Sequence, residues 1–400
     1  MNKNINVYDL LKSGDHKDIK EHLLHEIYKI ASYCTKTIGE GFFGKVSIPA
    51  VGPYISVKID ENYYVVPIVI KEAKNIGNVY IDIVDDDLII NSDNGITCEA
   101  IMLFIISKLW YKGVNLHLPF MVGMGSCDDS RMHSVTHILL ERHGMLNPIE
   151  LKYENYVPTP NQLNWGDIKM SRLITIAEIS DYMNIYSDNN FKCKLPNNAE
   201  VYLPDFIDNF CIFYLHTSYF LWENLGLTLS DQHMNNIYVH WINDMSKCGK
   251  RSINKVEHIF YEIGKDKYIK VKTFGLIFKI GDIGCSVMNI QSNVMIVGDL
   301  AKQEKLKDIK VYKKRHNFYV AVLEFALGLF PREIINKTKI FSLLNSNKIL
   351  SKYIPYIGFT EKLDMNAPTE LELLNDVIFD DFISLNTVDD DKNFVIKMKI

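Results

Sequence analysis

The chain lacks a long apolar run, an excess of basic residues and a secretory signal. Among its 400 residues, an apolar stretch such as 211–222 is interrupted at His216 and is shorter than the roughly 18 residues of a membrane span. Lys and Arg number 44 against 49 Asp and Glu, so the net charge of −5 gives no reason to expect direct nucleic-acid binding. The polar first residues have no apolar signal region. We therefore expect a cytoplasmic protein without a transmembrane segment.

Paired-cysteine motifs are also missing. The seven cysteines form no C-x-x-C pair, and their odd number and wide scatter are typical of reduced thiols. Hydrophobic residues make up 47% of the chain and charged residues 23%, which excludes disorder as the main state. The length is sufficient for one large domain or for two lobes around a cleft.

The texture of the sequence changes along the chain and predicts four regions. β-Branched and aromatic runs over 38–90 predict strands, apolar runs predict a helix over 98–111 and strands over 120–124 and 135–141, and helical periodicity follows over 170–186, 203–225 and 318–329. A Pro- and Asn-rich segment near 144–165 predicts the connection between two lobes. The predicted regions are an N-terminal helical extension (1–34), an N-terminal lobe (35–144), a C-terminal lobe (145–330) with an insertion at 240–278, and a C-terminal helical extension (331–400).

The first candidate motif is a glycine-rich turn between two strand-like runs. Gly39, Gly41 and Gly44 have G-x-G-x-x-G spacing, which lets backbone N–H groups approach phosphate oxygens. Alone, this spacing also fits a glycine turn without special function. A dinucleotide-binding fingerprint is disfavoured because a strand, and not a helix, is predicted to follow.

A lysine and a glutamate form the second candidate. Lys71 ends an apolar strand-like run, where its ammonium could neutralise phosphate oxygens, and Glu99 lies on the predicted helix that could hold it. Taken singly, the two residues also fit a lysine with its stem on the surface and a solvated glutamate.

Acidic and amide residues form the third and fourth candidates. Asp231 is followed five residues later by Asn236 and then by an apolar strand, a spacing that can place a carboxylate at an acceptor hydroxyl and an amide on a metal. Asp282 leaves an apolar strand just before the turn residue Gly284. Such a carboxylate can bind Mg²⁺, which prefers hard oxygen ligands.

The order of these motifs resembles that of the protein-kinase family. The resemblance covers roughly residues 35–330 and implies an α+β, bilobal protein-kinase-like fold, with a strand-rich N-terminal lobe containing one main helix and a mostly helical C-terminal lobe. The Ile-, Asn- and Lys-rich composition and the strand-like insertion resemble the divergent kinases of large DNA viruses, such as the poxvirus virion-assembly kinases. For a viral protein, the expected location is the viral factory or the virion.

The resemblance implies a role for each matching residue. Lys71 would contact the ATP phosphates with Glu99 as its partner, Asp231 would orient the acceptor hydroxyl, and Asn236 and Asp282 would hold Mg²⁺. The nucleotide contacts that it implies are the glycine loop with Val46, Leu140 as gatekeeper, and the backbone of Glu141 and His143 at the adenine. The implied activity is ATP- and Mg²⁺-dependent transfer of phosphate to Ser/Thr of a protein substrate.

Departures from the family pattern leave two other functions open. Leu229-Ser230 replaces the usual His-Arg before the catalytic acid, and no aspartate is found in the late helix to brace the loop, which also fits a pseudokinase scaffold. His233 replaces a lysine that protein Ser/Thr kinases carry, and such a histidine also occurs in small-molecule kinases of the choline and aminoglycoside type. The basic stretch 302–315 fits recruitment of acidic substrates, or an exposed lysine-rich loop.

Overall fold

The structure is a computed structural model. The described residues are 35–40, 44–49, 54–59, 62–73, 79–84, 86–92, 96–127, 135–141, 164–165, 168–169, 175–195, 197–230, 232–242, 247–248, 251–253, 255–291, 293–298, 319–352, 367–387 and 392–400. The predicted helical extension over 1–34 and the basic stretch 302–315 lie outside them.

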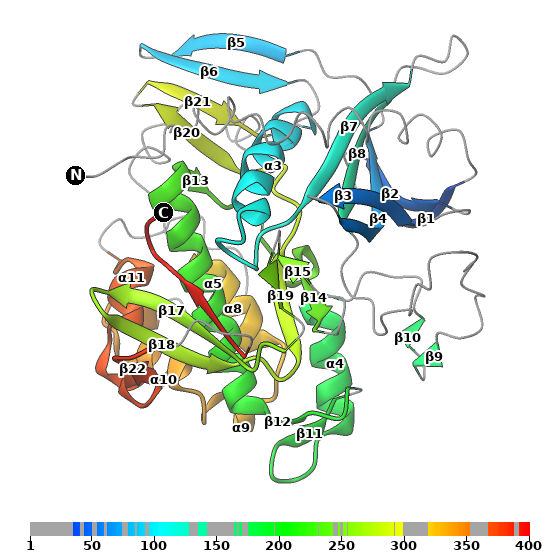
Figure 1. Ribbon diagram of the computed structural model, residues 1–400. Coiled ribbons are helices and arrows are strands. Elements are labelled where there is room, and N and C mark those ends of the chain that lie inside the picture. Colours follow the sequence, from blue (N-terminus) through cyan, green and yellow to red (C-terminus); the bar gives the residue numbers. More distant parts are fainter. Residues whose placement is uncertain are drawn as a thin grey trace. The chain divides into compact units, whose positions relative to one another are not determined.

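The chain divides into two compact units, which are shown with their elements in Figure 1. The first comprises residues 1–173, 248–250 and 282–307, and the second comprises 174–247, 251–281 and 308–400. Both contain strands and helices, so the fold is mixed α/β with several sheets. None of the described helices has both the length and the apolar character needed to span a membrane.

The larger sheet of the first unit is antiparallel and has six strands. Its order is β1-β2-β4-β8-β7, with β3 also paired to β4. The central strand β4 places Lys71 opposite Val46 on one side and Ile138 on the other. The strand-rich prediction for 38–90 and the two later strands are thereby confirmed. The strands are β1 (Thr35–Glu40), β2 (Gly44–Pro49), β3 (Tyr54–Ile59), β4 (Asn62–Ala73), β7 (Met121–Cys127) and β8 (Val135–Glu141).

A second sheet of the first unit joins distant parts of the chain around one helix. β5 (Val79–Val84) pairs with β6 (Asp87–Ser92), which runs parallel to β21 (Val294–Val297), and β21 pairs with β20 (Val287–Gln291). Helix α3 (Ile96–Tyr111) packs against β6, β7, β8 and β21. Its apolar side chains are buried, because an apolar helix must be covered on several sides. Two short strands, β9 (Asn164–Trp165) and β10 (Ile168–Lys169), pair with each other.

The second unit is built around helix α5 (Leu203–Leu225), which confirms the predicted helix over 203–225. The helix has Pro204 in its first turn, where the missing N–H is not needed, and ends at Gly226, which adopts φ 60° in the left-handed region. Its buried residues lie on nearly all sides, so it forms the core of the unit. The predicted helices over 170–186 and 318–329 correspond to α4 (Ile176–Tyr186) and α8 (Tyr319–Gly328).

Strands and short helices complete the second unit. A sheet of order β22-β18-β17-β23 lies apart from the β14–β19 pair, and β11 pairs with β12. The remaining elements are β11 (Lys192–Lys194), β12 (Glu200–Tyr202), β13 (Leu227–Thr228), η3 (Met234–Asn236), β14 (Ile237–Trp241), β15 (Lys247–Cys248), β16 (Arg251–Ser252), β17 (His258–Gly264), β18 (Lys267–Lys272), β19 (Leu276–Ile280), α9 (Arg332–Ile335), α10 (Lys339–Ser346), η5 (Leu350–Lys352), α11 (Glu370–Leu374), η6 (Val377–Phe382), β22 (Ile383–Ser384) and β23 (Asn393–Ile396).

The described part of the predicted C-terminal helical extension (331–400) contains strands as well as helices. Residues 393–396 form β23, which runs parallel to β17 and buries Phe394 and Ile396. The alternation of buried and half-buried residues in β23 has the period of a strand, and the neighbouring edge of β17 supplies its hydrogen bonds.

Replacing Asp208 by alanine should strongly destabilise the second unit. The buried Asp208 carboxylate accepts hydrogen bonds from the backbone N–H groups of Lys339 and Ile340 at 2.9 Å, at the first turn of α10. Alanine leaves both donors without this acceptor, at a cost of about 1–3 kcal/mol each. Urea unfolding measures the loss, and the exposed Asp205 of the same helix provides the control, Asp205→Ala. Equal unfolding free energies for the two variants would contradict this capping role.

His216 should make the protein less stable in acid. Its Nε2 donates to the carbonyl of Glu262 at 2.9 Å, and burial lowers the pKa of the ring to about 4, which this hydrogen bond only partly opposes. The unfolded chain therefore binds the proton first, and the unfolding free energy falls as the pH drops from about 6.5 to 4.

Two variants isolate the contribution of His216 to the pH dependence of the unfolding free energy. His216→Gln keeps a side-chain N–H donor without a group that titrates, so its unfolding free energy should fall less steeply over the same pH interval. Burial raises the pKa of Asp208 to about 6, which makes that residue favour the folded state at lower pH and oppose the histidine. Comparing the two proteins in an Asp208→Asn background removes this opposing effect of Asp208. Parallel pH profiles for wild type and His216→Gln would contradict the assignment.

Candidate functional site

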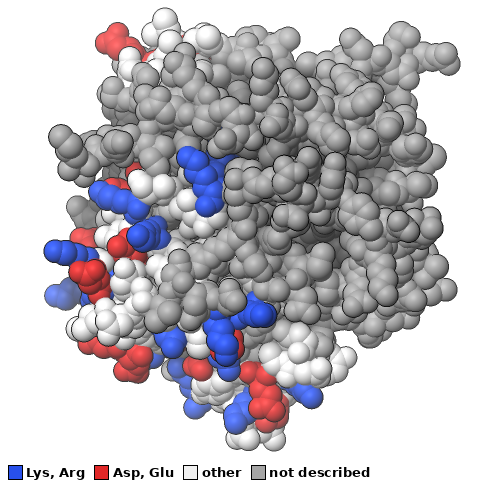
Figure 2. Space-filling model, in the orientation of Figure 1, with Lys and Arg blue, Asp and Glu red and all other residues white. Residues whose placement is uncertain are grey.

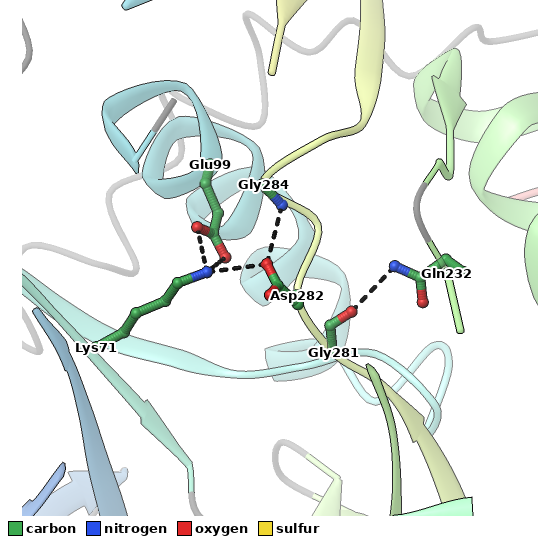
Figure 3. Close-up of polar contacts among 6 residues, drawn as sticks. All are labelled: Lys71, Glu99, Gln232, Gly281, Asp282 and Gly284. Carbon is green, nitrogen blue, oxygen red and sulfur yellow. Dashed lines mark hydrogen bonds and ion pairs between the residues drawn. The ribbon is translucent and has the colours of Figure 1, made fainter. Parts of the chain in front are cut away.

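Three predicted residues meet in the first unit (Figure 3). The Nζ atom of Lys71 donates to both carboxylate oxygens of Glu99, at 2.8 and 2.7 Å, and to Oδ1 of Asp282 at 2.9 Å. The lysine and the aspartate are 211 positions apart in the sequence. One ammonium thus joins two carboxylates that come from different elements.

Each of the three side chains is held by a defined element. Lys71 lies on the central strand β4, and Glu99 lies in the first turn of α3, where the helix dipole favours a negative charge. Asp282 follows β19 and has φ 41°, in the left-handed region that aspartate tolerates better than most residues. The N–H of Gly284 lies 3.4 Å from Asp282 Oδ1, so the carboxylate also contacts its own turn.

The three side chains differ in their access to solvent. Glu99 is 3% exposed, Lys71 14% and Asp282 44%. Burial lowers the pKa of Lys71, but the negative charges of Asp282 and Glu99 and their hydrogen bonds outweigh it and raise that pKa, so the lysine is charged at neutral pH. Burial raises the pKa of Glu99, with Asp282 adding to the shift and Lys71 opposing it. Glu99 is therefore an internal anchor for the lysine, while Asp282 is the accessible member.

This arrangement can bind a phosphate and a hard cation together. A lysine held by a buried carboxylate presents a fixed positive charge, and an accessible aspartate offers oxygen ligands to Mg²⁺. Within the described ranges, no three His, Cys, Asp or Glu side chains gather into a metal-binding cluster. Mg²⁺ typically uses one or two carboxylates together with substrate phosphates, so Asp282 fits a metal that arrives with a nucleotide.

A second cluster in the second unit holds the residue that precedes Asp282. The buried Gln232 donates from Nε2 to the carbonyl of Gly281 at 3.1 Å, and the Gly281 N–H donates to the carbonyl of Asn236 at 2.8 Å. Both polar groups of the Gly281 backbone are thus bound by residues 232–236. The Asn236 side chain is itself buried, at the end of η3.

The structure places some of the other predicted residues by their backbone. Gly39 pairs with Val46, and Glu40 with Lys45, across the β1–β2 hairpin, with Gly44 at the start of β2. Leu140 and Glu141 lie on β8, opposite Val69 and Ile68 of β4. The other predicted site residues, Gly41, His143 and Asp231, lie outside the described residues.

Two features of the site were missed by the sequence analysis. The spacing of the motifs suggested the Lys71–Glu99 pair. It assigned Asp282 only as a ligand of Mg²⁺, so the direct contact of Lys71 with Asp282 was not predicted. Gln232 was not singled out either, because a glutamine between charged and polar neighbours is usually exposed, whereas this one is buried. The only available signal was its position between the candidate residues Asp231 and Asn236.

Comparisons with known proteins add no relative. No protein-family model matches the chain, and no curated protein matches it significantly.

Proposed function

We propose that the protein is a kinase that transfers the γ-phosphoryl group of ATP to Ser/Thr hydroxyls of protein substrates. The observation that supports this most is the contact of one lysine with both Glu99 and Asp282 at 2.7–2.9 Å. The proposal includes a bilobal protein-kinase-like fold and a cytoplasmic location, in a viral factory or virion for a viral protein. It rests on the order of the motifs in the sequence and on this cluster.

The residues of the cluster would divide the work by their charge and access. The Lys71 ammonium would bind the α- and β-phosphates of the substrate ATP, and Glu99 would keep it in place from the interior. Asp282 and Asn236 would hold Mg²⁺, which neutralises phosphate charge when bound. The glycine-rich β1–β2 hairpin with Val46 would cover the phosphates, and Leu140, Glu141 and His143 would line the adenine site.

Positioning would supply most of the catalysis. The bound nucleotide would be fixed by charges that the fold has already placed, which lowers the barrier of an in-line transfer. Asp231 would orient the acceptor hydroxyl and accept its proton. As the serine or threonine oxygen forms the new P–O bond, the bond between the γ-phosphorus and the β–γ bridging oxygen would break and ADP would leave.

Incubation with γ-labelled ATP, Mg²⁺ and a mixture of proteins tests the proposal. We expect label on Ser/Thr of the proteins with the wild type and a loss of about 10²–10³-fold with Asp282→Asn. The matched control is Asp86→Asn, because Asp86 is exposed, has φ 68° and lies in the same unit. Asparagine tolerates this backbone conformation, so both variants should fold.

The outcomes separate the three functions considered from the sequence. No incorporation above the Asp282→Asn level would refute the protein kinase. Rapid turnover of one small alcohol, with none on proteins, would identify a small-molecule kinase. A pseudokinase would bind ATP equally well with and without Asp231→Asn and would transfer phosphate neither to proteins nor to small alcohols.

Under this proposal, Gln232 should act as a positioning residue for the metal site. Gln232→Leu removes the donor to the Gly281 carbonyl while keeping similar bulk, so the peptide before Asp282 loses one of its two restraints. We expect the Mg²⁺ concentration for half-maximal transfer to rise about tenfold, in the range seen when groups supporting metal ligands are lost.

The control for this variant is Asn235→Ala, since Asn235 is exposed on η3, the short helix that follows Gln232. Transfer by Gln232→Leu should recover at high Mg²⁺, whereas a loss caused only by misfolding would not. An unchanged Mg²⁺ dependence would refute the positioning role.

A further inference from the structure

A pocket of about 450 Å³ opens within the second unit, and its lining contains none of the candidate site residues. Its walls come from the β11–β12 hairpin, the β17–β18 hairpin, the first turns of α5 and Phe382 of η6. The volume lies in the range of pockets that bind ligands.

Three lysines give part of this pocket a positive charge. Lys270 and Lys272 lie two residues apart on β18, so both side chains are on one face of the hairpin, and Lys192 comes from β11. His258 is the cross-strand partner of Lys272 and also lines the pocket. Burial, followed by the charges of Lys270 and Lys272, lowers the pKa of His258, in agreement with a positive local field.

Two carboxylates in the same lining limit what this charge can bind. Glu200 lies on β12 and Asp205 in the first turn of α5. With three lysines against two acids, the lining is nearly balanced, which does not suit a polyphosphate or a nucleic-acid backbone. On the face seen in Figure 2, the described surface likewise carries Lys/Arg and Asp/Glu interspersed, and not a patch of one sign. The pocket suits a ligand with few negative charges and with donor groups of its own.

The buried side-chain amide of Asn209 favours a ligand that carries a hydrogen-bond donor. Asn209 lines the pocket and is 5% exposed, and its Nδ2 donates to the Lys272 carbonyl at 2.9 Å. This bond fixes the orientation of the amide, because only the nitrogen can donate to a carbonyl. Within the described part of the chain, Oδ1 accepts no hydrogen bond. A buried acceptor without a partner is unfavourable, so a ligand N–H or O–H that reaches this oxygen would gain a hydrogen bond.

We propose that this pocket docks an acidic peptide segment of the protein substrate, an inference that rests on the proposed kinase function. A backbone N–H of the segment would donate to Asn209 Oδ1, and an acidic side chain would lie among the lysines. An apolar side chain would pack against Phe274 and Phe382, which also line the pocket. A peptide offers these three groups together, whereas a free inorganic anion offers only the charge.

Direct binding tests this docking without any requirement for catalysis. The probe is a short fluorescein-labelled peptide containing Ala-Glu-Ala-Leu-Phe, and its partner peptide carries Ala-Gln-Ala-Leu-Phe. Fluorescence anisotropy with the full chain should give tighter binding of the acidic peptide. The Lys270→Glu/Lys272→Glu variant should weaken it about tenfold or more. Lys194→Glu is the matched control, because Lys194 is exposed on β11 but does not line the pocket.

Three results would overturn the docking site. They are equal affinity for the two peptides, equal affinity in wild type and Lys270→Glu/Lys272→Glu, and displacement of the acidic peptide by inorganic phosphate as effective as by unlabelled peptide. Circular dichroism spectra of the charge-reversal variants establish that they are folded. Lys192→Glu, on a different hairpin, repeats the test if the double variant does not fold.

Kinetics then separate this inference from the proposed function. With an acidic peptide carrying a serine, Lys270→Glu/Lys272→Glu should raise KM about tenfold and leave kcat unchanged, since the pocket residues do not touch the transferred phosphate. Phosphoryl transfer with an unchanged KM would refute the docking site but would not contradict the proposed kinase function. Peptide binding without any transfer would refute the kinase and the substrate role, and would leave a peptide-binding pocket.

Discussion

Replacing Lys71 by methionine is expected to lower phosphoryl transfer at least about a hundredfold and to destabilise the first unit. The loss of transfer follows from removing a fixed positive charge at the phosphates. The loss of stability has a separate cause, because Glu99 is 3% exposed and would remain buried with no cation beside it. Breaking a buried ion pair by removing one partner costs about 3–5 kcal/mol.

A double variant separates these two effects. In Lys71→Met/Glu99→Leu both charges are replaced by apolar groups, and such replacements are often neutral or stabilising. We therefore expect the unfolding free energy to return to within about 2 kcal/mol of wild type, while transfer remains at the level of Lys71→Met. Urea unfolding and label transfer from ATP are measured on the same preparations.

The double variant also distinguishes a catalytic lysine from a structural one. If the lysine only neutralised Glu99, restoring stability would restore any activity that depends on folding. Recovery of transfer in Lys71→Met/Glu99→Leu would therefore contradict the proposed contact with ATP. Lys112 follows α3 in the same unit and is exposed, so Lys112→Met is the control, with transfer and stability near wild type.

Local elements were predictable because their signals are local. The helix over 203–225 has a proline at its start, a glycine just past its end and apolar residues throughout, and the structure has it with the same bounds. The strand runs before residue 90 were equally clear from their β-branched and aromatic composition. Such signals depend on the side chains of a few neighbouring residues.

Long-range pairing was not predictable in the same way. The strand β21 runs parallel to β6, with Met295 opposite Ile89, and nothing in either segment names the other as its partner. The same holds for β23, which joins the edge of β17 from the end of the chain. The pairing of Lys71 with Glu99 was suggested by a strand lysine that needs a carboxylate, by a glutamate on the next helix and by the motif order. The direct Lys71–Asp282 contact depends on the turn after β19, which a one-dimensional pattern does not specify.

Gly298→Ala should have the second large effect, because Gly298 packs against the turn after β19 that contains Asp282. Gly298 follows β21, and its N–H donates to the carbonyl of Ser286 at 2.9 Å. An added Cβ would lie 2.9 Å from both the Gly284 carbonyl carbon and the Ser286 oxygen, and it would overlap the Gly284 oxygen. These are backbone atoms of the segment just after Asp282, so they cannot move aside as a flexible side chain can.

The alanine should therefore separate residue 298 from the turn and shift Asp282 with it. Overpacking of this kind costs about 1–3 kcal/mol of stability. Transfer should fall by about 10²-fold, because a displacement near 1 Å at a positioned group has an effect of that order. Both quantities are measured as for the lysine variants, with ATP and Mg²⁺ at saturating concentrations.

The control is Gly264→Ala, at a glycine in the β17–β18 hairpin whose added Cβ would have its nearest contact at 3.8 Å, to Cβ of Lys267. This is an ordinary contact, so the control should keep an unfolding free energy close to that of wild type. Its rate of phosphoryl transfer should lie within about a factor of two of the wild-type rate. If Gly298→Ala matched the control in both measurements, the close packing of residue 298 on the turn would have no part in holding Asp282. A loss of stability with full transfer at low temperature would assign Gly298 to folding alone, since the folded fraction would then still place the carboxylate correctly.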